Sequence, residues 1–274
     1  MAMVISNLVI DRILRGCMFS TTTREALWNV SQISSFSISV TSDSQDAVDA
    51  TDTPIMTFYR AKQCEITAEN ALWDLGLFAA QGGNELEAST ATNKFNVPIF
   101  DEITLESATT ATLTHTPKLP AGETYAVPYI YVLNGDGTLG KKLACGGSTA
   151  TGVYTQAGTT VTFASGDLAV GDTIIAFYEY EANGTSGTQA LRMKNSAKDF
   201  PKAGKFVMEI LCCDPCDKST LYYAYLILPS ATLAPDVDLD FSTDARHSFT
   251  LRAQQDYCDK EKLLYSLVVP EAAA

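Results

Sequence analysis

Three cysteines close together, Cys212, Cys213 and Cys216, have the most obvious capacity for chemistry in this chain. A Cys-x-x-Cys pair can ligate zinc or exchange disulfides. Structural zinc sites normally use two such pairs, however, and the other cysteines are scattered. A redox pair would start a helix, whereas Asp214-Pro215 predicts a turn between two strands. We therefore expect a hairpin turn with incidental thiols, and metal binding by Cys213 and Cys216 stays the alternative.

Carboxylates alternate with apolar residues further along the chain. Asp236, Asp238 and Asp240 would share one face of a strand whose other face carries Val237 and Leu239. Hard oxygen ligands of this kind suit Ca²⁺, but successive side chains on one face of a strand point in parallel and do not converge on one ion. We expect a solvated or lumen-facing acidic strand, with Ca²⁺ binding as the alternative.

The two histidines, His115 and His247, offer no catalytic setting. Neither lies near a Gly-x-Ser-x-Gly elbow or a predicted helix N-terminus, where a nucleophile would be activated. No glycine-rich phosphate loop precedes a helix. The sequence therefore predicts that the protein is not an enzyme and takes no cofactor.

The composition is that of a folded, acidic protein. Of 274 residues, 46% are hydrophobic, and 32 acidic against 19 basic residues give a net charge of −13. Gripping nucleic acid needs a basic patch, so this balance argues against it. No apolar run reaches the roughly 18 residues that cross a membrane. The N-terminal run 3–10 lacks the order of a signal peptide, and the seven cysteines lack the spacing of a disulfide scaffold, so we expect reduced thiols in a protein made in the cytoplasm.

Residues 37–83 give the clearest prediction of elements. Alternating polar and apolar residues open this stretch as a half-buried strand, and a second extended run covers 55–66. Thr67 is the expected N-cap of a helix that Gly82-Gly83 ends. The intervening loop, residues 42–54, carries four carboxylates and no basic residue: Asp43, Asp46, Asp49 and Asp52.

The rest of the chain predicts β structure in two domains. Residues 101–188 are rich in Thr and Gly, with short strands at regular spacing and strong turn signals, which is typical of a small antiparallel, Ig-like β-sandwich. Residues 1–100 and 189–274 would form the main fold. We therefore expect a mainly β protein with one α-helix and an inserted β-sandwich domain.

Four passages together point to a family. They are 7–16, the strand and acidic loop with 58–62 and 68–72, 197–205, and 249–256. In these passages, which lie within roughly residues 5–100 and 190–270, the sequence resembles the major tail tube proteins of long-tailed bacteriophages.

The resemblance implies a tail-tube-type β-sandwich or barrel flanked by one helix. Such subunits self-assemble as hexameric rings that stack into the tail tube of the virion, the conduit for genome delivery. The partners would be further copies of the chain, the tape measure protein and terminator or baseplate proteins, with DNA passing through unbound and no membrane involved. The loop carboxylates would contact a neighbouring subunit, and the three carboxylates of residues 236–240 would face the lumen and repel phosphate.

Two other classes stay open. A capsid decoration or head-fibre protein would use residues 101–188 as its functional surface. An adhesin or carbohydrate-binding module would show a secretion signal and a cluster of exposed aromatic residues. The enzyme class has the least support.

Overall fold

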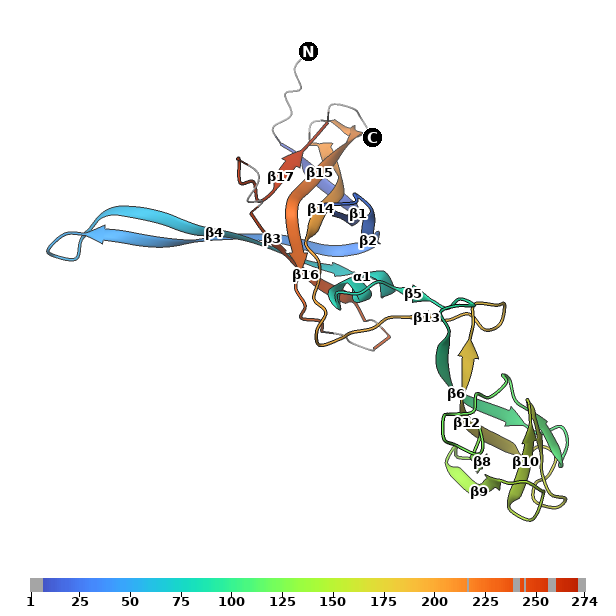
Figure 1. The fold of residues 1–274 in the computed structure, drawn as a ribbon. Helices are drawn as coiled ribbons and strands as arrows, with labels where there is room; N and C mark the ends of the chain where they lie inside the picture. The colour runs from blue at the N-terminus through green and yellow to red at the C-terminus, as the bar shows by residue number, and fades with distance from the viewer. Residues whose placement is uncertain (1–6, 216, 239–241, 244, 256–259, 271–274) are drawn as a thin grey trace. The chain divides into compact units, whose positions relative to one another are not determined.

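The computed structural model describes residues 7–270 except 216, 239–241, 244 and 256–259. Strands make up 53% of the chain, and the described part contains one helix, so the mainly β prediction is confirmed. The chain divides into two compact units, one formed by residues 1–86 and 193–274 and the other by residues 87–192 (Figure 1). That residues 101–188 form a separately folding domain stays a prediction.

The first unit is built on an eight-stranded antiparallel sheet. Its order is β2-β1-β14-β15-β16-β4-β3, and β17 pairs with β15. The long strand β15 is shared by β14 along one side and by β16 and β17 on the other. The strands are β1 (Val9–Ser20), β2 (Ala26–Val30), β3 (Ile33–Val48), β4 (Pro54–Asn70), β14 (Gly204–Asp214), β15 (Asp217–Leu233), β16 (His247–Ala253) and β17 (Ser266–Val268).

One face of this sheet and the single helix, α1 (Leu75–Gln81), enclose the core of the first unit. Every second residue of the central strands points inward, as the period-two pattern predicts. The largest fully buried side chains of this core are Met18, Ile66, Leu77, Phe206, Met208, Leu228 and Leu251.

The start of the helix differs from the sequence prediction. The N-cap is Asp74, whose carboxylate accepts a hydrogen bond from the backbone N–H of Leu77 at 2.7 Å. Thr67, the expected cap, lies in β4 instead. The strand continues to Asn70 because it is hydrogen-bonded on both sides, by β3 and by β16. Tertiary pairing here overrides a local capping signal.

The end of the helix follows the sequence. Gly83 has a φ of 72°, and the next N–H, that of Asn84, bonds back to the carbonyl of Ala79 at 2.9 Å, which closes the helix with a Schellman-type turn. A Cβ at Gly83 would meet the backbone of Phe200 at 2.5 Å. Only glycine fits here without displacing that segment.

The second unit contains a curled seven-stranded sheet in the order β6-β12-β8-β9-β10-β11-β7 and a two-stranded pair, β5 with β13. β9 and β10 run parallel, which an all-antiparallel sandwich would not include. The strands are β5 (Glu87–Ala88), β6 (Phe95–Thr104), β7 (Thr110–Thr112), β8 (Tyr129–Leu133), β9 (Leu139–Cys145), β10 (Val153–Ala157), β11 (Thr160–Thr162), β12 (Thr173–Ala182) and β13 (Leu191–Arg192).

The second unit begins and ends outside the expected limits of 101 and 188. Strand β6 starts at Phe95, which pairs with Ala182 of β12, and β13 ends at Arg192 in a pair with β5, so residues on both flanks belong to the second unit. Pro98 is tolerated inside the strand at an outward-facing, exposed position.

Candidate assembly surface

The cysteine motif lies at the turn between β14 and β15, with Pro215 in the turn. Cys212 is buried, and burial raises the pKa of its thiol, so this cysteine is a packed, protonated side chain. Cys213 is half-buried, and Cys216 lies outside the described residues. Within the described part of the chain, no group of three His, Cys, Asp or Glu side chains gathers as a metal site.

Each histidine packs against aromatic rings in a different unit. His115 stacks on Tyr180 at 3.9 Å. His247 is fully buried beside Phe78, and its Nε2 lies 2.7 Å from Oε1 of Gln81. Burial lowers the pKa of His247, so the ring is neutral at physiological pH. Both rings therefore contribute to packing.

A buried carboxylate in the second unit is also structural. Asp101 accepts hydrogen bonds from the backbone N–H of Thr114 at 2.7 Å, from the hydroxyl of Thr114 at 2.7 Å and from the hydroxyl of Tyr178 at 2.6 Å. These three donors satisfy the charge at a site that is 4% exposed. The network joins β6 and β12 to the segment after β7.

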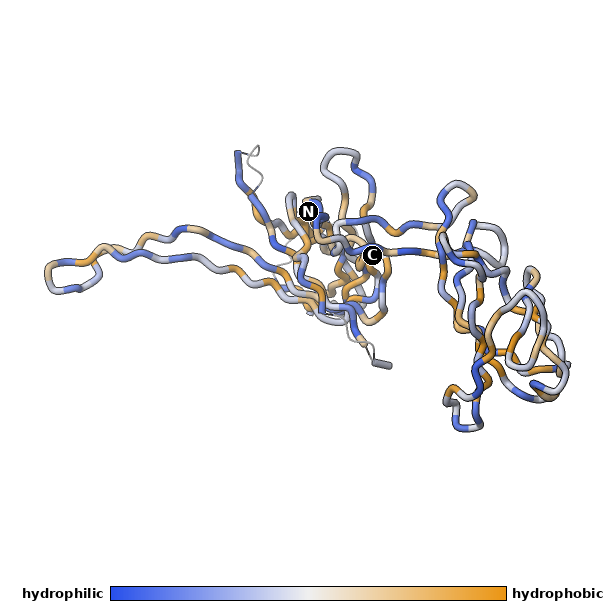
Figure 2. The backbone as a smooth tube through the Cα atoms, turned by 60° about the horizontal axis from the view of Figure 1, so that its bottom comes forward, coloured by the Kyte–Doolittle hydropathy of each residue, from blue (hydrophilic) through white to orange (hydrophobic). Residues whose placement is uncertain are grey.

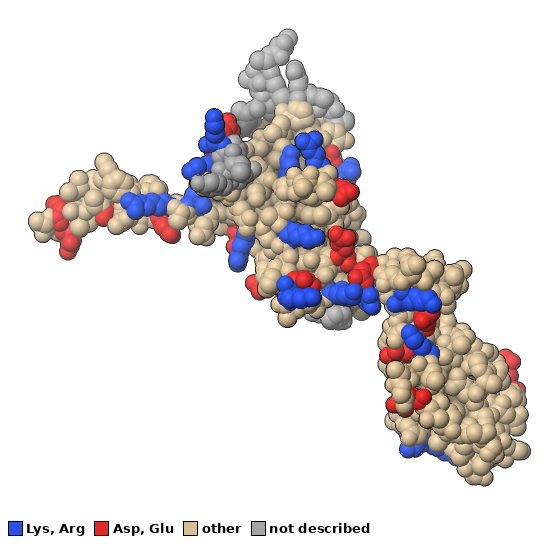
Figure 3. All heavy atoms as spheres, viewed as in Figure 1, with Lys and Arg blue, Asp and Glu red and all other residues tan. Residues whose placement is uncertain are grey.

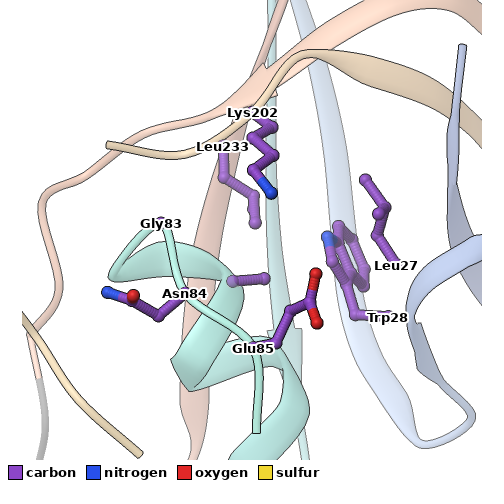
Figure 4. A pocket seen from close by; sticks show the side chains of 8 residues that line it. Leu27, Trp28, Gly83, Asn84, Glu85, Lys202 and Leu233 are labelled. Carbon is purple, nitrogen blue, oxygen red and sulfur yellow. The ribbon is translucent and has the colours of Figure 1, made fainter. Parts of the chain in front are cut away.

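A small pocket opens beside α1 in the first unit (Figure 4). Leu27 and Trp28 form its apolar side, and Glu85 and Lys202 lie at its polar side. Its volume is about 40 Å³, room for a few water molecules. A gap of this size is a packing feature and does not define a ligand site.

The acidic strand expected at residues 236–240 is not formed where the structure describes it. Asp236 and Asp238 are exposed, but they lie in an irregular segment after β15. Asp240 lies outside the described residues. The segment follows Pro235, where β15 has ended, and no described strand pairs with it. That these carboxylates face a lumen stays a prediction.

The most unusual feature of the first unit is the hairpin of β3 and β4, which extends far from the sheet that carries it (Figure 1). Near its base, Cys64, Ile66 and Ala68 of β4 are buried, and β16 pairs with this part of β4. From residue 37 of β3 to residue 63 of β4, every residue is exposed. The expected loop of residues 42–54 is therefore mostly strand, and only the tip is a turn.

A β-bulge separates the two halves of the hairpin. Thr41 pairs with Gln63, but Asp43 pairs with Arg60, so two residues of β4 oppose one residue of β3. Ala61 lies at the bulge with a φ of 48°. We call the part from the bulge back to the sheet the base half and the part from the bulge to the tip the distal half.

The distal half carries large apolar side chains on both faces. Met56 and Phe58 are opposite Ala47 and Gln45 and point to one face. Tyr59, which follows Phe58, points to the other face and is 75% exposed. Ile55 lies at a second register shift near the tip and is 71% exposed. A free two-stranded ribbon has no core of its own to cover either face, so this surface is suited to burial between neighbouring molecules.

The four loop carboxylates also lie on the distal half. Asp43 and Asp46 are in β3, and all four side chains are exposed. Asp49 orders the tip: it accepts hydrogen bonds from the hydroxyl of Thr51 at 2.7 Å and from the N–H groups of Thr53 at 3.0 Å and Thr51 at 2.8 Å, which together lower its pKa. Figure 2 shows hydrophobic stretches along the hairpin, and Figure 3 shows acidic residues near its end.

The sequence analysis did not identify the two-faced character of the distal half. Its signal was present in the pair Phe58-Tyr59, because adjacent residues in a regular strand point to opposite faces. A strand with apolar residues on both faces is typically buried on both sides, either within its own fold or by neighbouring molecules in an assembly.

The edge of the sheet, like the hairpin, exposes a surface that another chain could cover. β3 is the last strand of the sheet and is 16 residues long, so one side of its backbone has no strand partner among the described strands. A long, regular edge strand is a template for pairing with another chain.

No helix in the described part of the chain is long and apolar enough to cross a membrane.

A mainly β fold with an unpaired sheet edge and an apolar, protruding hairpin is typical of structural proteins that associate through exposed strands. Consistent with that class, the sequence matches the model of the YomU/Tube protein family over residues 14–265. The chain therefore belongs to the YomU/Tube protein family, which indicates a structural tube protein of a bacteriophage. No curated protein matches the sequence.

Proposed function

We propose that this protein is the tail tube subunit of a long-tailed bacteriophage virion, with a tail-tube-type main fold and an Ig-like insertion. Copies would form hexameric rings that stack into the conduit for genome delivery. Membership of the YomU/Tube family supports a tube and a non-enzymatic role. The single observation that carries the mode of assembly is the distal half of the β3–β4 hairpin.

The hairpin would insert between neighbouring copies. Its two apolar faces need two surfaces to cover them, one from each of two neighbours or from two parts of one neighbour. Burying an exposed side chain such as Ile55 or Tyr59 contributes on the order of 1.5–3 kcal/mol. The carboxylates at the tip, Asp46 and Asp52 among them, would then select the orientation of the contact, since like charges brought together are penalised.

The acidic net charge suits the passage of DNA. A wall of negative potential repels the phosphate backbone and prevents the genome from adhering. Asp236, Asp238 and Asp240 are the residues proposed to contribute to this wall. The tape measure protein and the terminator or baseplate proteins would be the other partners.

The test is to shorten the hairpin without disturbing its base. Residues 42–62 are replaced by Asn-Gly, which favours a type I′ turn and joins Thr41 directly to Gln63, its register partner. We expect a folded, soluble subunit with unchanged circular dichroism in the base sheet but no rings or tubes by negative-stain microscopy. Normal tubes from the shortened protein would refute the role of the hairpin.

A wild-type control decides the wider proposal. Rings and filaments of the full chain support the tube, and the symmetry of the rings tests the hexamer. A wild-type protein that stays monomeric or trimeric at high concentration, and binds capsids, would favour a decoration protein instead. A matched variant, Val170→Ala in the second unit, changes an exposed apolar residue outside the hairpin and should assemble normally.

A further inference from the structure

Aromatic side chains gather on the outer face of the sheet in the second unit. Phe100 of β6 is 74% exposed, Tyr129 of β8 is 45% exposed, and Phe177 of β12 and Tyr131 of β8 are half-buried. We call these four residues the aromatic face. The opposite face of the same strands supplies the core, including Ile130 and Ile174, so the aromatic face is not needed to fill it.

The rings of the aromatic face touch one another across three strands. Phe100 and Phe177 are opposite each other in the register, with ring centroids 5.3 Å apart. Phe177 and Tyr131 follow at 6.1 Å. On the next strand, Nζ of Lys142 lies 4.7 Å from the ring centroid of Tyr129. The planes of the two aromatic ring pairs meet at 79° and 67°, so Phe177 stands edge-on between Phe100 and Tyr131. Tyr131 is in register with Ile175, which pairs with Glu102, so the aromatic row runs obliquely across the strands.

Charged side chains alternate with these rings. Glu102 follows Phe100 at the next outward position of β6, and Glu179 follows Phe177 at the next outward position of β12; both are exposed. A protein partner covering the rings would also desolvate these carboxylates, which interface cores usually avoid. Acidic residues outnumber basic residues by ten to five in residues 87–192, so a polyanion is disfavoured as well.

The occupant that fits both features is uncharged, carries hydroxyl groups and has flat apolar faces. A pyranose ring has such faces, because its C–H groups can lie on the electron-rich face of an aromatic ring. Its hydroxyls can donate to Glu102 and Glu179. Neighbouring strands are about 4.8 Å apart, so Phe100 and Tyr131, which lie two strands apart, can each contact a sugar of one extended chain.

We propose that the aromatic face binds an extended β-1,4-linked polysaccharide. Equatorial linkages keep such a chain straight and leave the C–H faces of successive sugars open to the rings. Phe100 and Tyr131 are the stacking residues, and the two glutamates and Lys142 form hydrogen bonds to hydroxyls. This activity is separate from tube assembly and does not depend on it.

The experiment titrates the full-length protein with chitohexaose and, separately, with cellohexaose by isothermal calorimetry, at a concentration where the protein is unassembled. The two probes share the linkage and differ in the N-acetyl group. We expect binding of at least one of them. Phe100→Ala should weaken it about tenfold, the loss expected for one stacked ring, and Tyr131→Ala by a similar factor.

Matched controls separate binding from folding. Val170→Ala, an exposed apolar residue of the same unit outside the aromatic face, should bind as the wild type does. Thermal unfolding of Phe100→Ala should be unchanged, since this ring contributes little to the core. Glu102→Gln should weaken binding less than Phe100→Ala.

Three outcomes would overturn the proposal. The first is no heat of binding with either oligosaccharide at millimolar concentration. The second is equal binding by the wild type and the double variant Phe100→Ala, Tyr131→Ala. The third is a wild-type protein that self-associates through this face, shown by a change of molar mass in light scattering that Phe100→Ala abolishes, because a second copy would then be the occupant.

Discussion

The two halves of the β3–β4 hairpin share the same strands but have opposite surroundings. The base half is held by β16 on one side and by the core below, and Ile66 is fully buried. The distal half is exposed throughout and has no strand partner beyond its own hairpin. The comparison teaches that apolar residues in one continuous element can serve folding at one end and stay exposed at the other, where the proposed assembly would bury them.

The largest effect is expected in the base half. Ile66→Ala removes a fully buried side chain from the core and should lower the free energy of unfolding of the first unit by about 3 kcal/mol. Chemical denaturation of the unassembled protein measures this. A loss below about 1 kcal/mol would mean that the base is as loosely packed as the distal half, and the distinction would fail.

The base half should also respond to pH through His247, which is paired with Asn70 of β4. Burial lowers the pKa of His247 below its ordinary value of 6.5, an effect that Asp74 partly opposes. Because the unfolded chain takes up this proton first as the pH falls, the contribution of His247 is complete above about pH 6.5 and is lost below it.

Thermal unfolding of the first unit between pH 5 and pH 8 measures this dependence. His247→Phe, which keeps an aromatic ring among Trp73 and Phe78, should flatten the profile. A variant with the same slope as the wild type would assign the pH dependence to other groups.

A smaller effect on folding is expected in the distal half. Phe58→Ser should change the free energy of unfolding of the unassembled protein by less than about 0.5 kcal/mol, since the ring contacts no core. The same variant should form fewer or shorter tubes by electron microscopy. Strong destabilisation of the unassembled subunit would show that the distal half takes part in its fold.

The smallest effect is expected at the tip. Asp49→Asn keeps the shape of the side chain but weakens its hydrogen bonds to Thr51 and Thr53. Faster amide hydrogen exchange should therefore be confined to the turn, with the base half unaffected. Exchange that increases down to Ile66 would show that the two halves open as one unit.

Much of the fold could be predicted because it depends on local patterns. Alternation identified the strand that opens residues 37–83, which is part of β3, and Gly82-Gly83 identified the end of the helix. The start of the helix could not be read from Thr67, because the pairing of β4 with two other strands is a long-range property. The sequence of β9 carries no clear strand pattern, since Lys141 and Lys142 interrupt its apolar residues.

The candidate surface was harder to predict than the fold. Four carboxylates in a row of polar residues favour a loop, and nothing local shows that residues 43–48 pair with 54–60. Apolar residues indicate a candidate surface only when the structure shows that they are exposed, which the sequence alone does not tell. The aromatic face has the same character, because Phe100 and Phe177 are far apart in the sequence and meet through strand pairing.

The bulge at Ala61 bears on how this protein can diversify. On the base side of the bulge, Ile66 pairs with Ile38, whereas on the distal side Tyr59 pairs with Ser44, so the numbering parity of the two strands changes. A one-residue slip in a regular hairpin would turn every inward side chain outward. Here the extra residue at the bulge accommodates the one-residue change of register, so the side chains of the base half keep their orientation. The exposed distal half can therefore mutate or lengthen while the buried residues of the base half keep their inward orientation, so the scaffold stays the same when the protruding part changes.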